Sequence, residues 1–175
     1  MQFKILTEQD KVNYKQTILE TMRLCDNDFV PPLSARSSTT QKALIGGKSS
    51  EEGLVSYMTE MLSQVVLGAF EEDTLLGFVS FKENYTNDVI SDNNLPNIYL
   101  STLMLKSEAR GKNLTQKMYD YLFNTLYADR NIFTRTWSTN FAHLKILEKF
   151  DFKLIKTIKN DRGNNIDTFY FSLAR

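Results

Sequence analysis

The stretch Ser107-Glu108-Ala109-Arg110-Gly111-Lys112-Asn113-Leu114-Thr115 decides how the fold of this chain is interpreted. It is short, polar and basic, and it follows an apolar run over residues 97–105 that is typical of a buried strand. The amphipathic pattern over residues 114–127 predicts a helix directly after it. A strand–turn–helix junction of this kind points free backbone N–H groups and the positive end of a helix dipole at one place. The stretch can therefore hold an anion such as a pyrophosphate.

The composition is that of a globular protein with one domain, which we expect to span residues 1–175. Hydrophobic residues make up 42% of the chain, and 21 Lys and Arg balance 21 Asp and Glu. The resulting net charge of zero argues against a broad surface for nucleic acid or membranes. One Cys and one His cannot form a disulfide framework or a zinc cluster, so we expect no metal and a reduced, cytoplasmic setting. We also expect no signal peptide and no membrane span, because no apolar run is long enough.

The predicted elements follow the order strand, two helices, three strands, helix, strand, helix and two strands, which indicates an α/β (α+β) domain with a mixed sheet. Capping boxes are expected at Thr7 with Asp10 and at Ser49 with Glu52. Residues 26–48 are expected to form a long irregular connection of the kind that often carries binding function. The expected strands are 3–6, 65–70, 75–81, 97–105, 132–137, 152–158 and 167–173.

Two motifs in register resemble those of the GNAT family, the Gcn5-related N-acetyltransferases. Leu103-Met104-Leu105 is similar to the end of the family's cofactor-binding strand, and Arg110-Gly111 matches the central pair of the loop pattern P-x-x-R-G-x-G-x-G/A. Further along, NFAHLKILEKFDF over residues 140–152 resembles the family pattern N-x-x-A-x-x-L-Y-E-K-x-G-F. The resemblance covers most of the chain and is strongest over residues 99–152.

The resemblance implies a GNAT-like acyl-CoA N-acyltransferase fold, with a central mixed, mostly antiparallel sheet flanked by helices. It implies transfer of the acetyl group of acetyl-CoA, the cosubstrate, to a primary amine by direct attack. The strand would pair with the pantetheine arm, the N–H groups of residues 110–115 would hold the pyrophosphate, and Asn140 would hydrogen-bond the pantetheine. The cofactor-binding residues implied are Leu103, Met104, Leu105, Arg110, Gly111, Lys112, Asn113, Leu114, Thr115 and Asn140.

The partner expected on this resemblance is a small-molecule or peptide amine, with no nucleic acid and no membrane. The chain would act as a monomer or a homodimer. An alternative is a CoA-binding domain of the same fold with little or no catalysis, which would act as a sensor or interaction module.

The loop departs from the family pattern at Asn113, where the family prefers Gly. Asn tolerates left-handed backbone angles better than most residues, so the turn can still form. In a competing interpretation, Asn113 and Gln116 form a helix cap, because Asn is a favoured cap and Gln follows three residues later. That cap would fill the N–H groups and partly close the anion site.

The catalytic residues are not identified by the sequence. Leu147 stands where many family members carry a Tyr that protonates the leaving thiolate, and Tyr119 could supply a hydroxyl instead. The identity of the catalytic base is equally undecided. Ser101 and Thr102 could order a water, and Asp26 and Asp28 could meet a cationic substrate. Glu71 and Glu72 fall in a predicted hairpin turn, where we expect them to be solvated.

Other conspicuous residues are interpreted as structural. Gly46-Gly47-Lys48-Ser49 resembles the end of a phosphate-binding P-loop, but the pattern lacks its first Gly and a preceding strand. We expect His143 and Cys25 to be packing residues. Trp137 is expected to pack on the sheet and is also a candidate wall of the substrate site.

Overall fold

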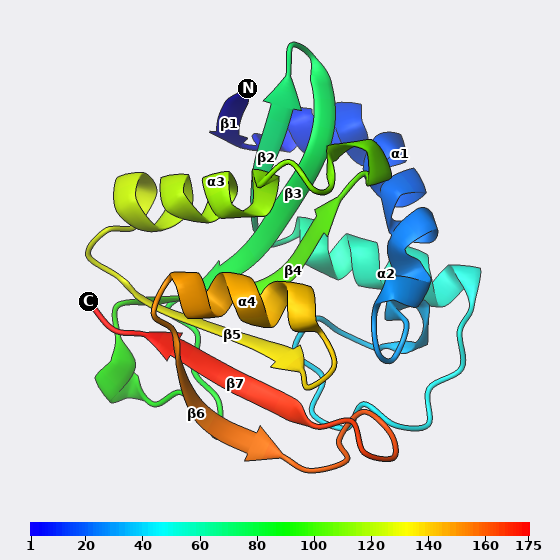
Figure 1. The fold of residues 1–175 in the computed structure, drawn as a ribbon. Coiled ribbons are helices and arrows are strands. Elements are labelled where there is room, and N and C mark those ends of the chain that lie inside the picture. The colour runs from blue at the N-terminus through cyan, green and yellow to red at the C-terminus, as the bar shows by residue number, and fades with distance from the viewer.

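A single seven-stranded sheet, in the order β1-β2-β3-β4-β5-β7-β6, organises the computed structural model, which describes residues 1–175 (Figure 1). All neighbouring strands are antiparallel except β4 and β5, which are parallel. This confirms the expected mixed, mostly antiparallel sheet. The strands are β1 Gln2–Ile5, β2 Val65–Glu71, β3 Thr74–Glu83, β4 Asn97–Leu105, β5 Asn131–Trp137, β6 Lys153–Ile158 and β7 Thr168–Leu173.

Four helices flank the sheet, and their order along the chain is the predicted one. They are α1 Glu8–Cys25, α2 Glu51–Leu62, α3 Leu114–Tyr121 and α4 Phe141–Lys149. Helix α3 continues into a π-helical turn over Leu122–Leu126. The helical segment therefore ends one residue before the predicted end at residue 127. The segment between α1 and α2 contains only two short 3₁₀ turns, which confirms its irregular character. None of the helices combines the length and hydropathy needed to span a membrane.

The helix starts show what local sequence can and cannot predict. The capping box at α1 is confirmed, since the Thr7 hydroxyl accepts from the Asp10 N–H at 3.1 Å and the Asp10 carboxylate accepts from the Thr7 N–H at 3.0 Å. The box predicted at Ser49 is wrong by one residue, because Ser50 is the cap and accepts from the Gly53 N–H at 2.9 Å. A Cβ atom on Gly53 would lie 2.2 Å from the Ser34 carbonyl oxygen, so tertiary packing fixes where α2 begins.

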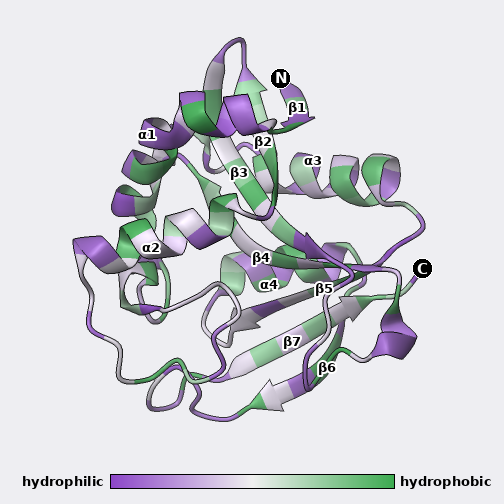
Figure 2. Cartoon of the chain, turned by 180° about the vertical axis from the view of Figure 1, so that it is seen from behind, coloured by the Kyte–Doolittle hydropathy of each residue, from purple (hydrophilic) through white to green (hydrophobic).

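The core lies on both faces of the sheet. Helices α1 and α2 pack on one face through residues such as Met22 and Tyr57, and α3 and α4 pack on the other through residues such as Met118 and Leu147. Strand side chains alternate between the faces, so the neighbours Phe78 and Val79 enter different clusters. Figure 2 shows that helices α1 and α2 carry both hydrophobic and hydrophilic residues, as expected of helices that bury one side.

Strands β4 and β5 part halfway along their length, as Figure 1 shows. They pair from Asn97 with Asn131 to Leu100 with Thr134, and no pairing follows. At the point of parting, β4 contains a β-bulge. Thr102 pairs with Ser80 and Leu100 pairs with Phe81, so Ser101 has no partner residue on β3. A bulge bends its strand and increases the twist. The sheet therefore opens between the carboxyl ends of its two parallel strands, where ligands bind in open α/β sheets.

Candidate active site

A cavity of about 440 Å³ occupies the opening between β4 and β5. Its lining comes from both sides of the sheet. Helices α3 and α4 and the loop before α3 contribute on one side, and Phe29, Arg36, Thr39 and Arg162 contribute on the other. The cavity therefore passes through the sheet, and a ligand on one face can meet a ligand on the other inside it.

The β4 edge of the cavity presents backbone polar groups. The carbonyl of Met104 faces Gly77 on β3, and the N–H of Lys106 donates to the Leu76 carbonyl at 2.9 Å. Because backbone groups of a strand alternate in direction, those of Leu103 and Leu105 point away from β3, toward the opening. The Leu105 carbonyl already accepts from Arg110 Nε at 3.3 Å, so the groups of Leu103 and the N–H of Leu105 are the ones left for a ligand. This edge can pair with an extended chain that carries amide groups, as a further strand would.

The loop before α3 leaves a run of backbone N–H groups without protein acceptors. The N–H groups of residues 111–116 make no hydrogen bond within the protein, and the first to do so is that of Lys117, to the Asn113 carbonyl at 3.1 Å. Gly111 and Asn113 both have left-handed backbone angles, with φ of 73° and 57°. Six consecutive N–H groups at the start of a helix are a site for a doubly charged anion.

Two details of this loop differ from the sequence-based expectations. The Asn113 side chain makes no capping hydrogen bond, and Gln116 accepts from Lys149 at 3.4 Å, so the competing cap interpretation is wrong. The left-handed backbone of Asn113 differs from the extended conformation of a capping residue. The N–H of Arg110 donates to the Ser107 carbonyl at 3.2 Å, so the free series begins at Gly111 and not at Arg110.

The Arg110 side chain fastens the loop to the end of α1. Its guanidinium donates to Asp28 at 2.7 Å and to the Cys25 sulfur at 3.0 Å, and the ion pair with Asp28 raises the pKa of Arg110. Burial raises the pKa of the Cys25 thiol, which fits the packing role expected for it. Asp26 accepts from the N–H and hydroxyl of Ser34 at 2.9 and 2.5 Å. Asp26 and Asp28 are therefore both engaged in the fold. Asp28 also lines the cavity, so its contact with a cationic substrate stays a prediction.

Tyr119 of α3 and His143 of α4 meet at the cavity. The Tyr119 hydroxyl and His143 Nε2 are 2.8 Å apart, and both residues line the cavity. Burial lowers the pKa of His143 to about 4 and raises the pKa of Tyr119, so both are neutral near pH 7. Leu147, at the position expected for a Tyr, is 1% exposed in the core. From the sequence we expected His143 to be a packing residue. Its position three residues after Asn140 places both on the same helix face, and this spacing could have indicated that His143 lines the site.

Asn140 is the N-cap of α4. Its Oδ1 accepts from the His143 N–H at 3.3 Å, and its Nδ2 donates to the Thr136 hydroxyl at 3.0 Å, which ties α4 to β5. Its contact with pantetheine stays a prediction. Nine of the ten cofactor-binding residues predicted from the sequence line the cavity, and the exception is Lys112, which is exposed to solvent.

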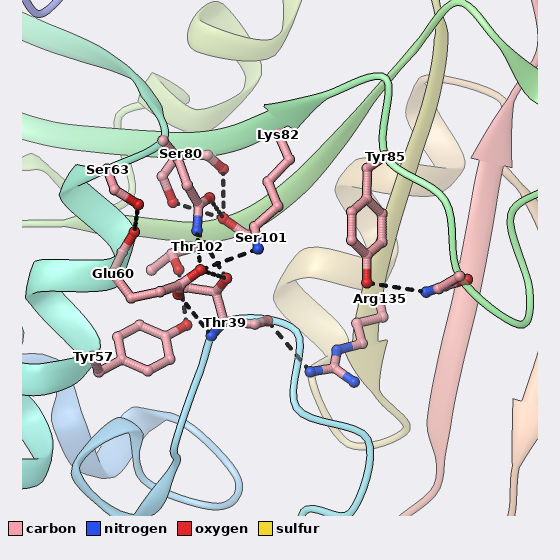
Figure 3. Close-up of polar contacts among 12 residues, drawn as sticks. Thr39, Tyr57, Glu60, Ser63, Ser80, Lys82, Tyr85, Ser101, Thr102 and Arg135 are labelled. Atoms are coloured by element: carbon pink, nitrogen blue, oxygen red, sulfur yellow. Dashed lines mark hydrogen bonds and ion pairs between the residues drawn. The ribbon is translucent and has the colours of Figure 1, made fainter.

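A polar network supports the bulged part of β4 (Figure 3). The Tyr57 and Thr102 hydroxyls are 2.9 Å apart, and the Ser101 hydroxyl donates to Gln64 at 2.6 Å. Glu60 accepts from the Thr39 N–H at 2.9 Å and pairs with Lys82 at 3.1 Å. These protein partners give Ser101 and Thr102 a structural role. Both residues also line the cavity, and the water-ordering role considered from the sequence stays a prediction. Glu71, the last residue of β2, and Glu72, in the β2–β3 turn, are both exposed, as expected.

Comparison with known proteins gives consistent findings. The model of the acetyltransferase (GNAT) family matches residues 39–152. An aminoglycoside 6'-N-acetyltransferase complexed with coenzyme A has a TM-score of 0.67 and 14% identity, over 99% of this chain and 96% of that one. The ribosomal-protein-alanine N-acetyltransferase of Brucella melitensis has the same score and identity over 100% of both chains. The yncA protein of Salmonella typhimurium, solved with its cofactor acetyl-CoA, has a TM-score of 0.63 and 15% identity over 99% of this chain and 93% of that one. No curated protein sequence matches the chain.

Proposed function

Because the chain belongs to the GNAT acetyltransferase family, we propose that it transfers the acetyl group of acetyl-CoA to a primary amine by direct attack inside the cavity between β4 and β5. The amine nitrogen forms a bond to the thioester carbonyl carbon, the carbon–sulfur bond breaks, and the amine loses one proton to solvent. The observation that carries the proposal is the row of free N–H groups over residues 111–116, beside strands that part.

The residues of the cavity fit the cosubstrate part by part. The N–H groups of residues 111–116 would hold the pyrophosphate, and the positive end of the α3 dipole adds to their attraction. Lys149, which lines the cavity and bonds Gln116, adds a positive charge beside them. The backbone groups of Leu103 and the N–H of Leu105 would pair with the amides of the pantetheine arm. Acetyl-CoA, when bound, supplies an acetyl group on a thiol that leaves readily.

Tyr119 is the hydroxyl that we assign to the leaving sulfur in place of a Tyr at position 147. Its raised pKa makes full loss of its proton unfavourable, so it acts as a hydrogen-bond donor to the thiolate. His143 Nε2 lies 2.8 Å from that hydroxyl and, with its proton on Nε2, donates to the hydroxyl oxygen, which leaves the tyrosine proton for the sulfur. The thiolate of a thiol resembling Cys, with a pKa of about 8.5, takes up a proton from solvent with little difficulty. The contribution of Tyr119 is therefore at or below the low end for general acid–base groups, about a hundredfold or less in rate.

A catalytically silent CoA-binding domain remains the second candidate function, and the buried Leu147 is the observation that favours it. The two candidates share the same cosubstrate site and differ only in turnover. Release of the CoA thiol after amines are added would distinguish the enzyme from the silent domain.

The proposal is tested by a calorimetric titration of acetyl-CoA into the protein, followed by a thiol-release assay with amines. We expect binding to one site and amine-dependent thiol release. Failure to bind acetyl-CoA would remove both candidates, whereas binding without any amine-dependent release would leave the silent domain.

A further inference from the structure

Three arginines, Arg36, Arg135 and Arg162, line the cavity on the side of the sheet opposite α3 and α4. They come from the segment before α2, from β5 and from the β6–β7 turn. Arg36 and Arg162 are only 8% and 6% exposed. No carboxylate oxygen lies within 4.0 Å of any of the three guanidinium groups, since none of them belongs to a salt bridge. Buried charges are ordinarily paired, so two unpaired buried arginines and a third, half-buried one in a single cavity need an explanation.

The three guanidinium groups bond only neutral acceptors. Arg36 donates to the Pro31 carbonyl at 3.0 and 2.7 Å. Arg162 donates to the Thr168 hydroxyl at 2.9 Å and to the Val30 carbonyl at 2.6 Å. Arg135 makes one bond of 3.4 Å, to the Thr39 carbonyl, which Figure 3 shows. A guanidinium carries more N–H donors than these acceptors use, so each arginine retains donors for a ligand.

Aromatic rings hold two of the arginines in place. The Arg162 guanidinium lies over the Trp137 ring at 5.4 Å, and the Arg36 guanidinium lies over the Phe29 ring at 5.6 Å. Trp137 and Phe29 contact each other with centroids 5.7 Å apart. The four side chains thus form one contiguous cluster, in which the two rings are tilted by 48° to each other. Packing on aromatic faces is a property of Arg that fixes its planar fork. The charges are preorganised before any ligand enters.

Positive charge also dominates the rest of the cavity. Its only acidic lining residue is Asp28, which is already paired with Arg110. Burial, followed by repulsion from Arg36 and Arg135, lowers the pKa of Arg162 to about 9. An anion placed among the three guanidinium groups would relieve that repulsion, whereas a cation would add to it.

We infer that the amine acceptor is a small molecule that also carries a carboxylate, such as an amino acid, and that Arg36, Arg135 and Arg162 bind this carboxylate. The inference rests on the proposed acetyl transfer, because it assigns the second substrate of the same cavity. Arg binds planar carboxylates with paired, charge-assisted hydrogen bonds. The surplus of positive charge also favours the neutral form of a nearby amine, which is the form that attacks. Polycationic acceptors such as polyamines and aminoglycosides are disfavoured by the same charges.

The first test is a thiol-release assay at saturating acetyl-CoA with amino acids and their carboxamides as matched acceptors. Removing the acceptor's charge leaves the buried arginines unpaired, so we expect kcat/KM to fall by about a hundredfold or more from carboxylate to carboxamide. Polyamines, aminoglycosides and phosphoethanolamine complete the panel. The inference is overturned if acetyl-CoA binds but no amino acid exceeds its carboxamide, or if a cationic or phosphate-bearing amine is the best acceptor.

The second test is the variant Arg135→Gln, chosen because Arg135 has a single long hydrogen bond and its loss disturbs the fold least. We expect its KM for the best amino acid to rise about tenfold to a hundredfold, with little change in acetyl-CoA affinity or in the turnover of carboxamides. Arg130→Gln, at an arginine outside the cavity, is the matched control. An equal effect of Arg135→Gln on carboxylate and carboxamide acceptors would refute the assignment. Failure of the proposed function is recognised separately, as absence of acetyl-CoA binding in the unchanged protein.

Discussion

The two ends of the cavity attract anions by different means. At the α3 end, the attraction comes from the backbone, through the N–H groups of residues 111–116 and a helix dipole. At the opposite end, it comes from the side chains of Arg36, Arg135 and Arg162, none of which forms a salt bridge. A backbone site depends on local conformation and tolerates many side chains, whereas a side-chain site is lost with single substitutions. The first therefore suits a cosubstrate shared by a family, and the second suits an acceptor particular to this chain.

The largest effect that separates the two ends is expected from Thr115→Asp. A carboxylate in the first turn of α3 would accept from the free N–H groups and occupy the anion site, while the helix dipole favours its charge. We expect acetyl-CoA affinity to fall by about a hundredfold, with Tm unchanged or slightly raised. Calorimetry and thermal unfolding measure the two quantities. A fall in Tm with unchanged affinity would show that these N–H groups do not hold the cosubstrate.

A pH effect is expected from His143, which lies beside the α3 end. Burial lowers its folded-state pKa to about 4, so between pH 6.5 and pH 4 the unfolded chain binds more protons than the folded one. The neutral His143 therefore costs no stability above pH 6.5, and the free energy of unfolding decreases as the pH falls toward 4. We expect a decrease of about 2 kcal/mol, after allowance for the partial exposure of the side chain. Urea unfolding of the protein and of His143→Gln over this range would measure it. Equal pH dependence of both would contradict the assignment.

A smaller effect is expected from Tyr119→Phe, which removes the hydroxyl facing His143. We expect kcat to fall about tenfold, with acetyl-CoA affinity nearly unchanged, because the hydroxyl stabilises only the departing sulfur. Steady-state kinetics and calorimetry provide the readouts. Tyr121→Phe, at a neighbouring tyrosine that does not line the cavity, is the control. No change in kcat would exclude Tyr119 from the chemistry.

The smallest effect is expected from Asn113→Gly. Because Asn113 makes no capping hydrogen bond, removing its side chain frees no N–H group, and Gly fits the left-handed angles at least as well. We expect acetyl-CoA affinity to change by less than about threefold. A tenfold gain in affinity by calorimetry would show that the Asn113 side chain does compete with the cosubstrate.

The difference between the two ends also explains what could be predicted from the sequence. The strands, the helices and the loop of residues 107–115 were predictable because each is a contiguous pattern with its own periodicity or turn chemistry. The arginine end was not predicted, because Arg36, Arg135 and Arg162 lie far apart in the chain and only the tertiary fold brings them together. The same holds for Tyr119 and His143, whose hydrogen bond joins two helices.

The central claim is that the free N–H groups of residues 111–116 hold the pyrophosphate of acetyl-CoA. The most direct measurement compares the calorimetric affinities of acetyl-CoA and acetyl-pantetheine, which share the thioester and the pantetheine arm but differ in the pyrophosphate and nucleotide. We predict that acetyl-pantetheine binds at least about a hundredfold more weakly, because it leaves several charge-assisted hydrogen bonds unmade. Equal affinities for the two compounds would contradict the account.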